Sequence, residues 1–137
     1  MHKTILFIDG SKTSILLLNE VIKSKKFIIE FIIISPSCSK IISKKLKKKY
    51  KEKVQISNLK NRKLVKKLSL FSCDIGFSYY DKKISIDILN SLKIGGINFH
   101  PSFLPYNKGR HSTFWSINQS TPFGATAHWL NNKFDDG

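Results

Sequence analysis

Asn98 and His100 end an apolar run and stand two residues apart, a spacing that can do chemistry. If residues 96–100 form a strand, both side chains project from the same face of the sheet. An asparagine amide donates hydrogen bonds without changing charge, and a histidine can donate, accept or carry a proton near neutral pH. The pair suits the stabilisation of an oxyanion formed when a nucleophile adds to a carbonyl. A structural alternative stays open, in which the Asn caps a loop and the His packs between aromatic side chains.

The loop after this pair is stiffened by its sequence. Pro101 restricts His100 to extended backbone geometry, which holds the pair in place. Pro105 constrains the loop 102–109, and Gly109 permits a backbone turn that a larger residue would strain. We therefore expect a fixed loop beside the Asn-His pair.

The last residues, 124–137, read GATAHWLNNKFDDG and supply further polar side chains. We expect a strand that contains His128, followed by a loop that ends in two aspartates and a glycine. An acidic residue in this loop could return to His100, orient its ring and raise its basicity. Such a pairing is typical of acid–base sites.

Strands and helices alternate along the chain before this site. Short apolar or β-branched runs predict strands at 4–8, 27–35, 53–57, 73–80 and 95–100. Helical periodicity predicts helices at 12–26, 38–53, 61–71 and 83–92, with Ser11 and Asn61 at the start of two of them. This alternation predicts an α/β fold with a mostly parallel sheet and helices on both faces. In that fold, ligands bind beyond the carboxyl ends of the strands.

The chain is strongly basic, with 24 Lys and Arg against 9 Asp and Glu, a formal net charge of +15. Such a charge suggests nucleic acid, an anionic membrane or a phosphorylated substrate as partner. AT-rich codon usage explains it equally, because nearly all the bases are Lys and lack the bidentate fork of Arg. In helix 38–53 we expect Ile41, Ile42 and Leu46 to face the core and the lysines to face solvent.

Length and cysteine content indicate what class of protein this is. The 137 residues are enough for one domain with its own core. Cys38 and Cys73 have no C-x-x-C spacing, so neither a zinc site nor a disulfide framework is indicated. No signal peptide or membrane-length apolar run is visible, and we expect a soluble, cytoplasmic protein.

The motifs resemble those of the folate-dependent formyltransferases, which include methionyl-tRNA, glycinamide ribonucleotide and sugar-nucleotide N-formyltransferases. The family pattern is Asn-x-His, Pro or Gly, and Ser-x-Leu-Pro-x-x-x-Gly, followed later by Gly-x-Thr-x-His and a loop closing on Asp-x-Gly. This chain has NFHPSFLPYNKG at 98–109 and the 124–137 segment quoted above. The resemblance implies a Rossmann-like formyltransferase fold and one catalytic domain over 1–137. It also implies that the C-terminal part of the family's domain is missing, so the chain would be a fragment or truncated.

The resemblance also implies roles for particular residues. Catalytic roles fall on Asn98, His100 and Asp135, with Asp136 at the neighbouring variable position as the alternative carboxylate. Folate binding is implied for Tyr79, Tyr80, Ile84 and Asn131. Substrate binding is implied for Ser102, Lys108, Gly109, Arg110 and His128. No metal is implied.

Among the subfamilies, the segments HPSFLPYNKGR, FWSI and TPFGATAH look closest to the sugar-nucleotide N-formyltransferases. The implied reaction moves a formyl group from 10-formyltetrahydrofolate to the amine of a nucleotide-linked amino sugar by direct attack through a tetrahedral intermediate. Lys108 or Arg110 could meet the phosphates, and Trp115 would either line the same side or pack in the core. The alternatives are a fragment of a methionyl-tRNA formyltransferase that binds tRNA and an inactive, basic nucleic-acid-binding module. A homodimer is also considered.

Overall fold

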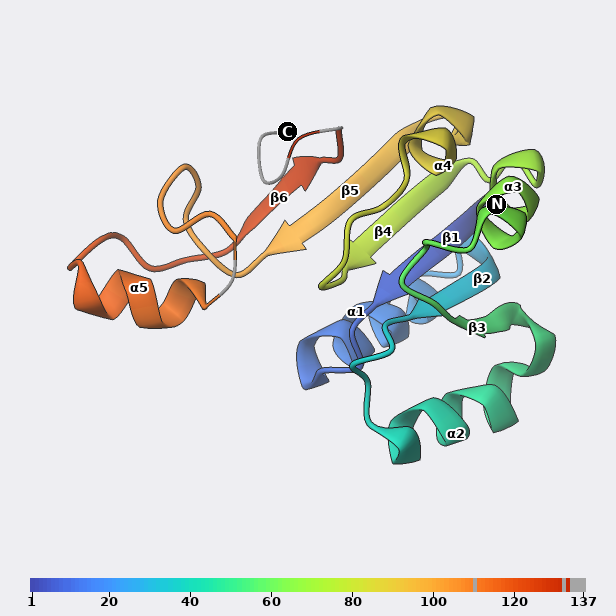
Figure 1. Cartoon of the computed structure of the whole chain (residues 1–137), viewed down its shortest axis with the longest axis horizontal. Helices are drawn as coiled ribbons and strands as arrows, with labels where there is room; N and C mark the ends of the chain where they lie inside the picture. Colours follow the sequence, from blue (N-terminus) through green and yellow to red (C-terminus); the bar gives the residue numbers. More distant parts are fainter. Residues whose placement is uncertain (110, 132, 134–137) are drawn as a thin grey trace.

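The computed structural model describes residues 1–109, 111–131 and 133 (Figure 1). In chain order, the described elements are β1 (His2–Ile8), α1 (Lys12–Lys23), β2 (Phe27–Ile34), α2 (Lys40–Tyr50), the 3-10 turn η1 (Lys51–Lys53), β3 (Val54–Ile56), α3 (Arg62–Leu70), β4 (Ile75–Tyr79), α4 (Ile86–Ser91), β5 (Gly95–His100), α5 (Ser112–Asn118) and β6 (Thr126–Trp129). No helix of this described part is long and apolar enough to cross a bilayer.

The strands form one sheet in the order β3-β2-β1-β4-β5-β6. The neighbours from β3 to β5 pair in parallel, and β6 pairs with β5 in the antiparallel sense. The carboxyl ends of β1, β4 and β5 therefore meet at one edge of the sheet, where ligands bind in this architecture. The predicted α/β class with a mostly parallel sheet is confirmed.

Helices cover both faces of the sheet, because alternate side chains of each buried strand point to opposite sides. In β1, Ile5 and Phe7 belong to the apolar cluster packed by α3 and α4. Leu6 and Ile8 belong to the cluster packed by α1 and α2. The prediction of helices on both faces is therefore confirmed as well.

The helix starts follow the capping residues. The Ser11 hydroxyl accepts a hydrogen bond from the Ser14 amide (3.2 Å), and the Asn61 side chain accepts from the first amides of α3. Ser39 caps α2, which starts two residues later than expected. The placement of Ile41 in the core was wrong, because its side chain is 68% exposed. The buried stripe of α2 contains Leu46 and, one turn before it, the partly buried Ile42.

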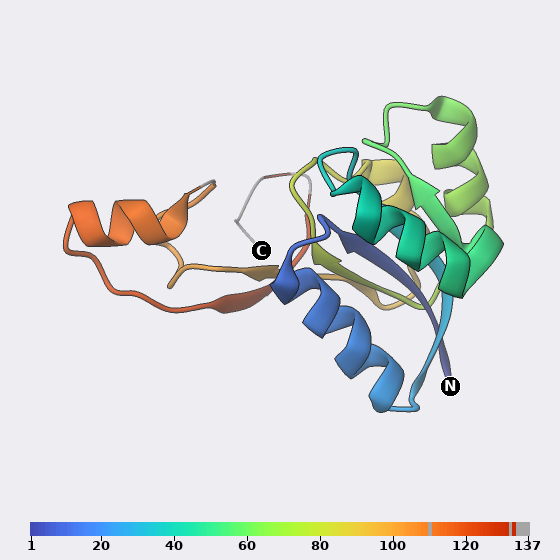
Figure 2. The same ribbon diagram turned by 90° about the horizontal axis from the view of Figure 1, so that it is seen from below.

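The described residues 101–109 and 111–125 lie between β5 and β6, outside the sheet, and we call them the excursion (Figure 2). Helix α5 lies in this excursion and stands away from the sheet in both ribbon views. Trp115 on α5 is 42% exposed and packs edge-on against Phe114. The alternative that Trp115 is a core residue was therefore wrong.

Candidate active site

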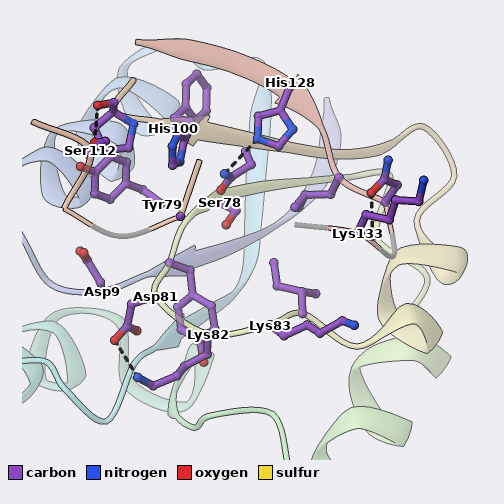
Figure 3. Close-up of a pocket in the computed structure, with 18 of the residues that line it drawn as sticks. Asp9, Ser78, Tyr79, Asp81, Lys82, Lys83, His100, Ser112, His128 and Lys133 are labelled. Carbon is purple, nitrogen blue, oxygen red and sulfur yellow. Dashed lines mark hydrogen bonds and ion pairs between the residues drawn. The ribbon is translucent and has the colours of Figure 1, made fainter. Parts of the chain in front are cut away.

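A cavity of about 490 Å3 lies at the carboxyl ends of β1, β4 and β5, and we call it the strand-end hollow (Figure 3). This volume is within the range of pockets that hold drug-sized ligands. Its walls combine polar side chains, among them Asn98, His100 and His128, with the apolar Ile84 and Leu89. The location is the one that the strand order predicts for a ligand site.

Asn98 and His128 face each other across the strand pair β5–β6. They are direct partners in the antiparallel register, and Asn98 Nδ2 lies 3.2 Å from His128 Nε2. His128 Nδ1 lies 3.0 Å from the Trp129 carbonyl oxygen, which can only accept, so Nδ1 carries the hydrogen. With the hydrogen on Nδ1, Nε2 accepts from the Asn98 amide. The side-chain amide of Asn98 is therefore held with its nitrogen toward His128.

His100 lies two residues beyond Asn98 at the end of β5 and is buried, with 6% exposure. Its Nε2 is 3.2 Å from the carbonyl oxygen of Asn107. The same reasoning assigns the Nε2 hydrogen to a bond donated to this carbonyl. The ring of His100 is thus fixed by the loop that the prolines stiffen.

The loop itself is held by side chains that do not line the hollow. Ser102 is 2% exposed, and its hydroxyl donates to the Tyr106 carbonyl oxygen at 2.9 Å. Thr126 on β6 donates to the Ser102 carbonyl at 2.7 Å and accepts from the Leu104 amide at 3.0 Å. Ser102, expected at the substrate, instead faces the interior of its own loop.

The apolar side of the hollow is formed by the segment after β4. Ile84 is 6% exposed, and the Tyr80 hydroxyl donates to the Ser57 carbonyl. Burial, with a smaller contribution from Asp81, raises the pKa of the Tyr80 phenol, which therefore stays protonated. Burial also raises the pKa of Tyr79. Both tyrosines are neutral wall residues at physiological pH.

The structure brings most of the residues with implied roles to this hollow. Those that line it are Asn98, His100, Tyr79, Tyr80, Ile84, Asn131, Gly109 and His128. Lys108, Ser102 and Trp115 are not among its lining residues. Arg110, Asp135 and Asp136 lie outside the described residues. Among the described residues, no group of three or more His, Cys, Asp or Glu side chains could hold a metal ion.

Sequence reasoning missed two acidic residues of the hollow, Asp9 and Asp81. Asp9 directly follows β1, and Asp81 lies two residues after β4. Because the carboxyl ends of parallel strands meet at one edge of the sheet, this position after a strand could have predicted both residues. Asp81 accepts hydrogen bonds from Ser37 (2.9 Å) and Lys82 (2.8 Å). Burial opposes its ionisation, but these hydrogen bonds outweigh burial and hold the pKa of Asp81 below its usual value.

The fold and the position of the hollow define a Rossmann-like α/β domain with a ligand site at the carboxyl ends of its strands. Residues 40–137 match the formyl transferase family. The chain therefore belongs to the formyl transferase family.

A curated relative is the bifunctional polymyxin resistance protein ArnA of Wigglesworthia glossinidia brevipalpis, 38% identical over 96 residues. The match covers 66% of this chain, and the chain spans only 15% of the length of that relative.

Solved structures of similar fold include glycinamide ribonucleotide transformylase 1 from Symbiobacterium toebii, with a TM-score of 0.76 and 16% identity over 100% of this chain and 69% of the other. A 4-N formyltransferase from Francisella tularensis has a TM-score of 0.73 and 25% identity, covering 98% of this chain and 52% of the other. A sugar N-formyltransferase from Shewanella sp FDAARGOS_354 has a TM-score of 0.74 and 20% identity, covering 98% of this chain and 54% of the other.

Proposed function

We propose that this chain transfers a formyl group from 10-formyltetrahydrofolate to the primary amine of a nucleotide-linked amino sugar. The observation that carries the proposal is the Asn98 amide, oriented by His128 at the edge of the strand-end hollow, with His100 two residues further along β5. In a member of the formyl transferase family, the Asn98 amide would be the hydrogen-bond donor that stabilises the oxyanion of the reaction.

The strand-end hollow suits the formyl donor, 10-formyltetrahydrofolate. One part of its wall is apolar, with Ile84, Leu89 and Leu130, and such a surface accepts the flat pteridine and benzoyl rings of a folate. Asn98 and His128 line the same hollow. A formyl carbon bound there would lie beside the Asn98 amide while the rings cover the apolar wall.

The chemistry is acyl transfer without a covalent enzyme intermediate. The amine nitrogen attacks the formyl carbon, and the carbonyl electron pair moves to the oxygen, which becomes an oxyanion. Asn98 donates to this oxyanion. Because the Nε2 hydrogen of His100 is donated to the Asn107 carbonyl, we place His100 on the same oxygen through Nδ1, which carries a hydrogen when the ring is an imidazolium. The carbon–N10 bond then breaks, N10 takes up a proton, and the attacking nitrogen loses one, so the protons balance. We assign movement of this proton to Asp135, beyond the described residues.

The acceptor class is supported by the named relatives and by charge. One structural relative is a sugar N-formyltransferase and another a 4-N formyltransferase. A nucleotide sugar carries a diphosphate, and the hollow is lined by Lys82, Lys83 and Lys133. These cations would meet an anionic substrate at the mouth of the site.

A formyl-transfer assay with an acceptor panel tests the proposal. The purified, folded chain receives 10-formyltetrahydrofolate and nucleoside-diphosphate sugars with an amine at carbon 3 or 4, glycinamide ribonucleotide or methionyl-tRNA. The same sugar nucleotides with a hydroxyl in place of the amine serve as controls. We expect turnover with an amino-sugar nucleotide and none with its hydroxyl counterpart. Turnover only with glycinamide ribonucleotide or methionyl-tRNA would contradict the acceptor, and no turnover with any acceptor would contradict the whole proposal.

A further inference from the structure

The backbone carbonyl of Asn107 determines which ring nitrogen of His100 can exchange a proton. This carbonyl oxygen lies 3.2 Å from His100 Nε2. A carbonyl oxygen can only accept, so Nε2 keeps its hydrogen both in the neutral ring and in the imidazolium. The second proton of the imidazolium therefore enters and leaves at Nδ1. The direction of the Asn107 carbonyl is thus a condition for proton exchange at Nδ1.

Two features of Asn107 set the direction of its carbonyl. Its backbone has a φ of +53°, in the left-handed region that asparagine adopts more readily than most residues. Its side-chain amide donates a hydrogen bond to the Thr121 hydroxyl, with Nδ2 and Oγ1 2.7 Å apart. Both side chains are partly buried, which limits the competition of water for this bond. The amide therefore anchors a residue whose backbone holds His100.

The other side-chain bonds described above for this loop stop short of position 107. Ser102 bonds to the Tyr106 carbonyl, and Thr126 bonds to the Leu104 amide and the Ser102 carbonyl. These bonds fix the first part of the loop. The Asn107–Thr121 bond is a separate restraint on the residue that contacts His100.

Thr121 connects this restraint to the end of α5. It follows the helix, and its amide donates to the Ser116 carbonyl oxygen at 3.1 Å. Hydrogen bonds therefore lead from α5, which stands away from the sheet (Figure 1), through Thr121 and Asn107 to His100. His100 lines the strand-end hollow, whereas Asn107 and Thr121 are not among its lining residues. The pair would therefore act on a bound ligand through the residues that it holds.

We infer that Asn107 and Thr121 are positioning residues for His100. The Thr121 hydroxyl anchors the Asn107 side chain, and the Asn107 carbonyl holds the Nε2 hydrogen of His100. Nδ1 is then the nitrogen that gains the proton donated to the oxyanion. The effect on turnover rests on the proposed function, whereas the position of the Nε2 hydrogen can be measured without any substrate.

Nitrogen-15 NMR of the histidine rings in the full chain tests the position of this hydrogen. At about pH 8, above the usual pKa of histidine, protonated and unprotonated ring nitrogens give well-separated signals. We expect a hydrogen on Nε2 of His100 and on Nδ1 of His128, whose acceptor is the Trp129 carbonyl. The loss of signals in His100→Gln and His128→Gln assigns them. Absence of the hydrogen from Nε2 of His100 in the wild-type chain would overturn the inference.

Thr121→Val tests the anchor, because it removes the hydroxyl and keeps the branched shape of the side chain. The hydrogen of neutral His100 should then be shared between Nε2 and Nδ1, while His128 keeps its tautomer. With 10-formyltetrahydrofolate and the best amino-sugar nucleotide of the acceptor panel, kcat should fall about tenfold. That is less than the loss of a complete acid–base group. KM for both substrates should stay within about twofold, since Thr121 is not a lining residue of the hollow.

Conservative variants separate the hydroxyl from the fold. Thr121→Ser keeps the hydroxyl and should keep both kcat and the His100 spectrum. Asn107→Gly can adopt the same positive φ but lacks the amide, so it should resemble Thr121→Val. The double variant should lose no more than either single variant, because both remove the same bond. Thr113→Val, at an exposed threonine of α5, is the control and should change neither measurement.

Two results in the variants would overturn the positioning role and leave the proposed function standing. One is a wild-type kcat with an unchanged His100 spectrum in Thr121→Val. The other is an equal loss in Thr121→Val and Thr121→Ser, because the hydroxyl would then not matter. If the wild-type chain transferred no formyl group, the proposed function would fail, and the spectra would decide alone. A His100 tautomer that changes in Thr121→Val but not in Thr121→Ser would support the pair, and an unchanged tautomer would overturn it.

Discussion

The side-chain nitrogen of Asn98 lies 3.2 Å from Nε2 of His128 across the strand pair β5–β6. His128 is in turn fixed by its Nδ1 hydrogen on the Trp129 carbonyl. One strand thus carries the amide, and the neighbouring antiparallel strand sets the direction in which the amide points. In the proposed reaction, His128 acts on the formyl oxygen only through Asn98.

Replacing His128 therefore tests orientation rather than binding. His128→Leu removes the acceptor and frees the Asn98 amide to rotate, which should lower kcat for formyl transfer about tenfold, less than complete loss of an oxyanion donor. KM for donor and acceptor should change less than kcat. His128→Gln supplies an amide oxygen as acceptor and should recover part of the loss. An unchanged kcat in His128→Leu would show that the pair has no part in turnover.

Gly10 and Gly109 provide a comparison of backbone strain with steric overlap. Both have positive φ, +85° and +83°. A Cβ at Gly10 would overlap the Cys38 sulfur, whereas no atom of the described residues lies within 4 Å of a Cβ at Gly109. Gly109→Ala should lower the free energy of unfolding by about 1 kcal/mol, from the backbone alone. Gly10→Ala should lower it by about 3 kcal/mol, because overpacking adds to the same strain.

Urea denaturation measures both changes in the free energy of unfolding. A Gly10→Ala, Cys38→Ala double variant should recover part of the loss, because it removes the overlapping sulfur. Equal losses in Gly10→Ala and Gly109→Ala would mean that the contact with Cys38 does not matter.

The two cysteines should differ in reactivity. Burial, with smaller contributions from Glu30 and Asp74, raises the pKa of Cys73 to about 11, so at pH 8 roughly one Cys73 thiol in a thousand is ionised. Burial also raises the pKa of Cys38, but this side chain is partly exposed. Iodoacetamide at pH 8 should therefore modify Cys38 first in the folded protein. Mass spectrometry of the peptides measures how fast each cysteine is modified. The control is urea-unfolded protein, in which Cys38 and Cys73 should both react. Equal rates of modification in the folded protein would refute the burial of Cys73.

Asp81 should make stability depend on pH. Its folded-state pKa is lowered, so its carboxylate stabilises the fold above about pH 4, the usual value in an unfolded chain. This contribution is lost as the pH falls through the folded-state pKa. Asp81→Asn should therefore lower the free energy of unfolding by about 1 kcal/mol at pH 7, the scale of a hydrogen bond to a partly buried charge. The difference from wild type should disappear at low pH.

Denaturation at a series of pH values measures this difference, with Glu52→Gln, at an exposed carboxylate outside the hollow, as the control. A difference for Asp81→Asn that stays constant from pH 7 to pH 3 would contradict the assignment.

The parallel part of the fold could be predicted because its signals are local. Apolar runs such as residues 4–8 mark buried strands, and Ser11 and Asn61 mark helix starts by accepting hydrogen bonds from the first amides. The packing of α2 was harder to predict. Ile41 and Ile42 are adjacent and both apolar, and only their spacing to Leu46 distinguishes them. Ile42 lies four residues before Leu46, on the same side of the helix, and it is the one that packs against the core.

The site was predictable in location more than in contacts. Asn98 and His100 lie at a strand end, and spacing alone places them on one face. The meeting of Asn98 with His128 depends on how the excursion 101–125 returns, because that return sets the antiparallel register of β6. The orientation of the Ser102 side chain likewise depends on the hydrogen bond that its hydroxyl donates to the Tyr106 carbonyl oxygen. No pattern in the sequence predicts this hydrogen bond.

The most direct test of the proposed reaction is the turnover of Asn98→Ala with 10-formyltetrahydrofolate and the best amino-sugar nucleotide. The variant should fold, as circular dichroism would show, and kcat should fall by about a hundredfold to a thousandfold, the scale of one lost oxyanion donor. Asn90→Ala, at an exposed asparagine of α4, should leave kcat unchanged. A loss of less than about tenfold in folded Asn98→Ala would contradict the role of this amide at the oxyanion.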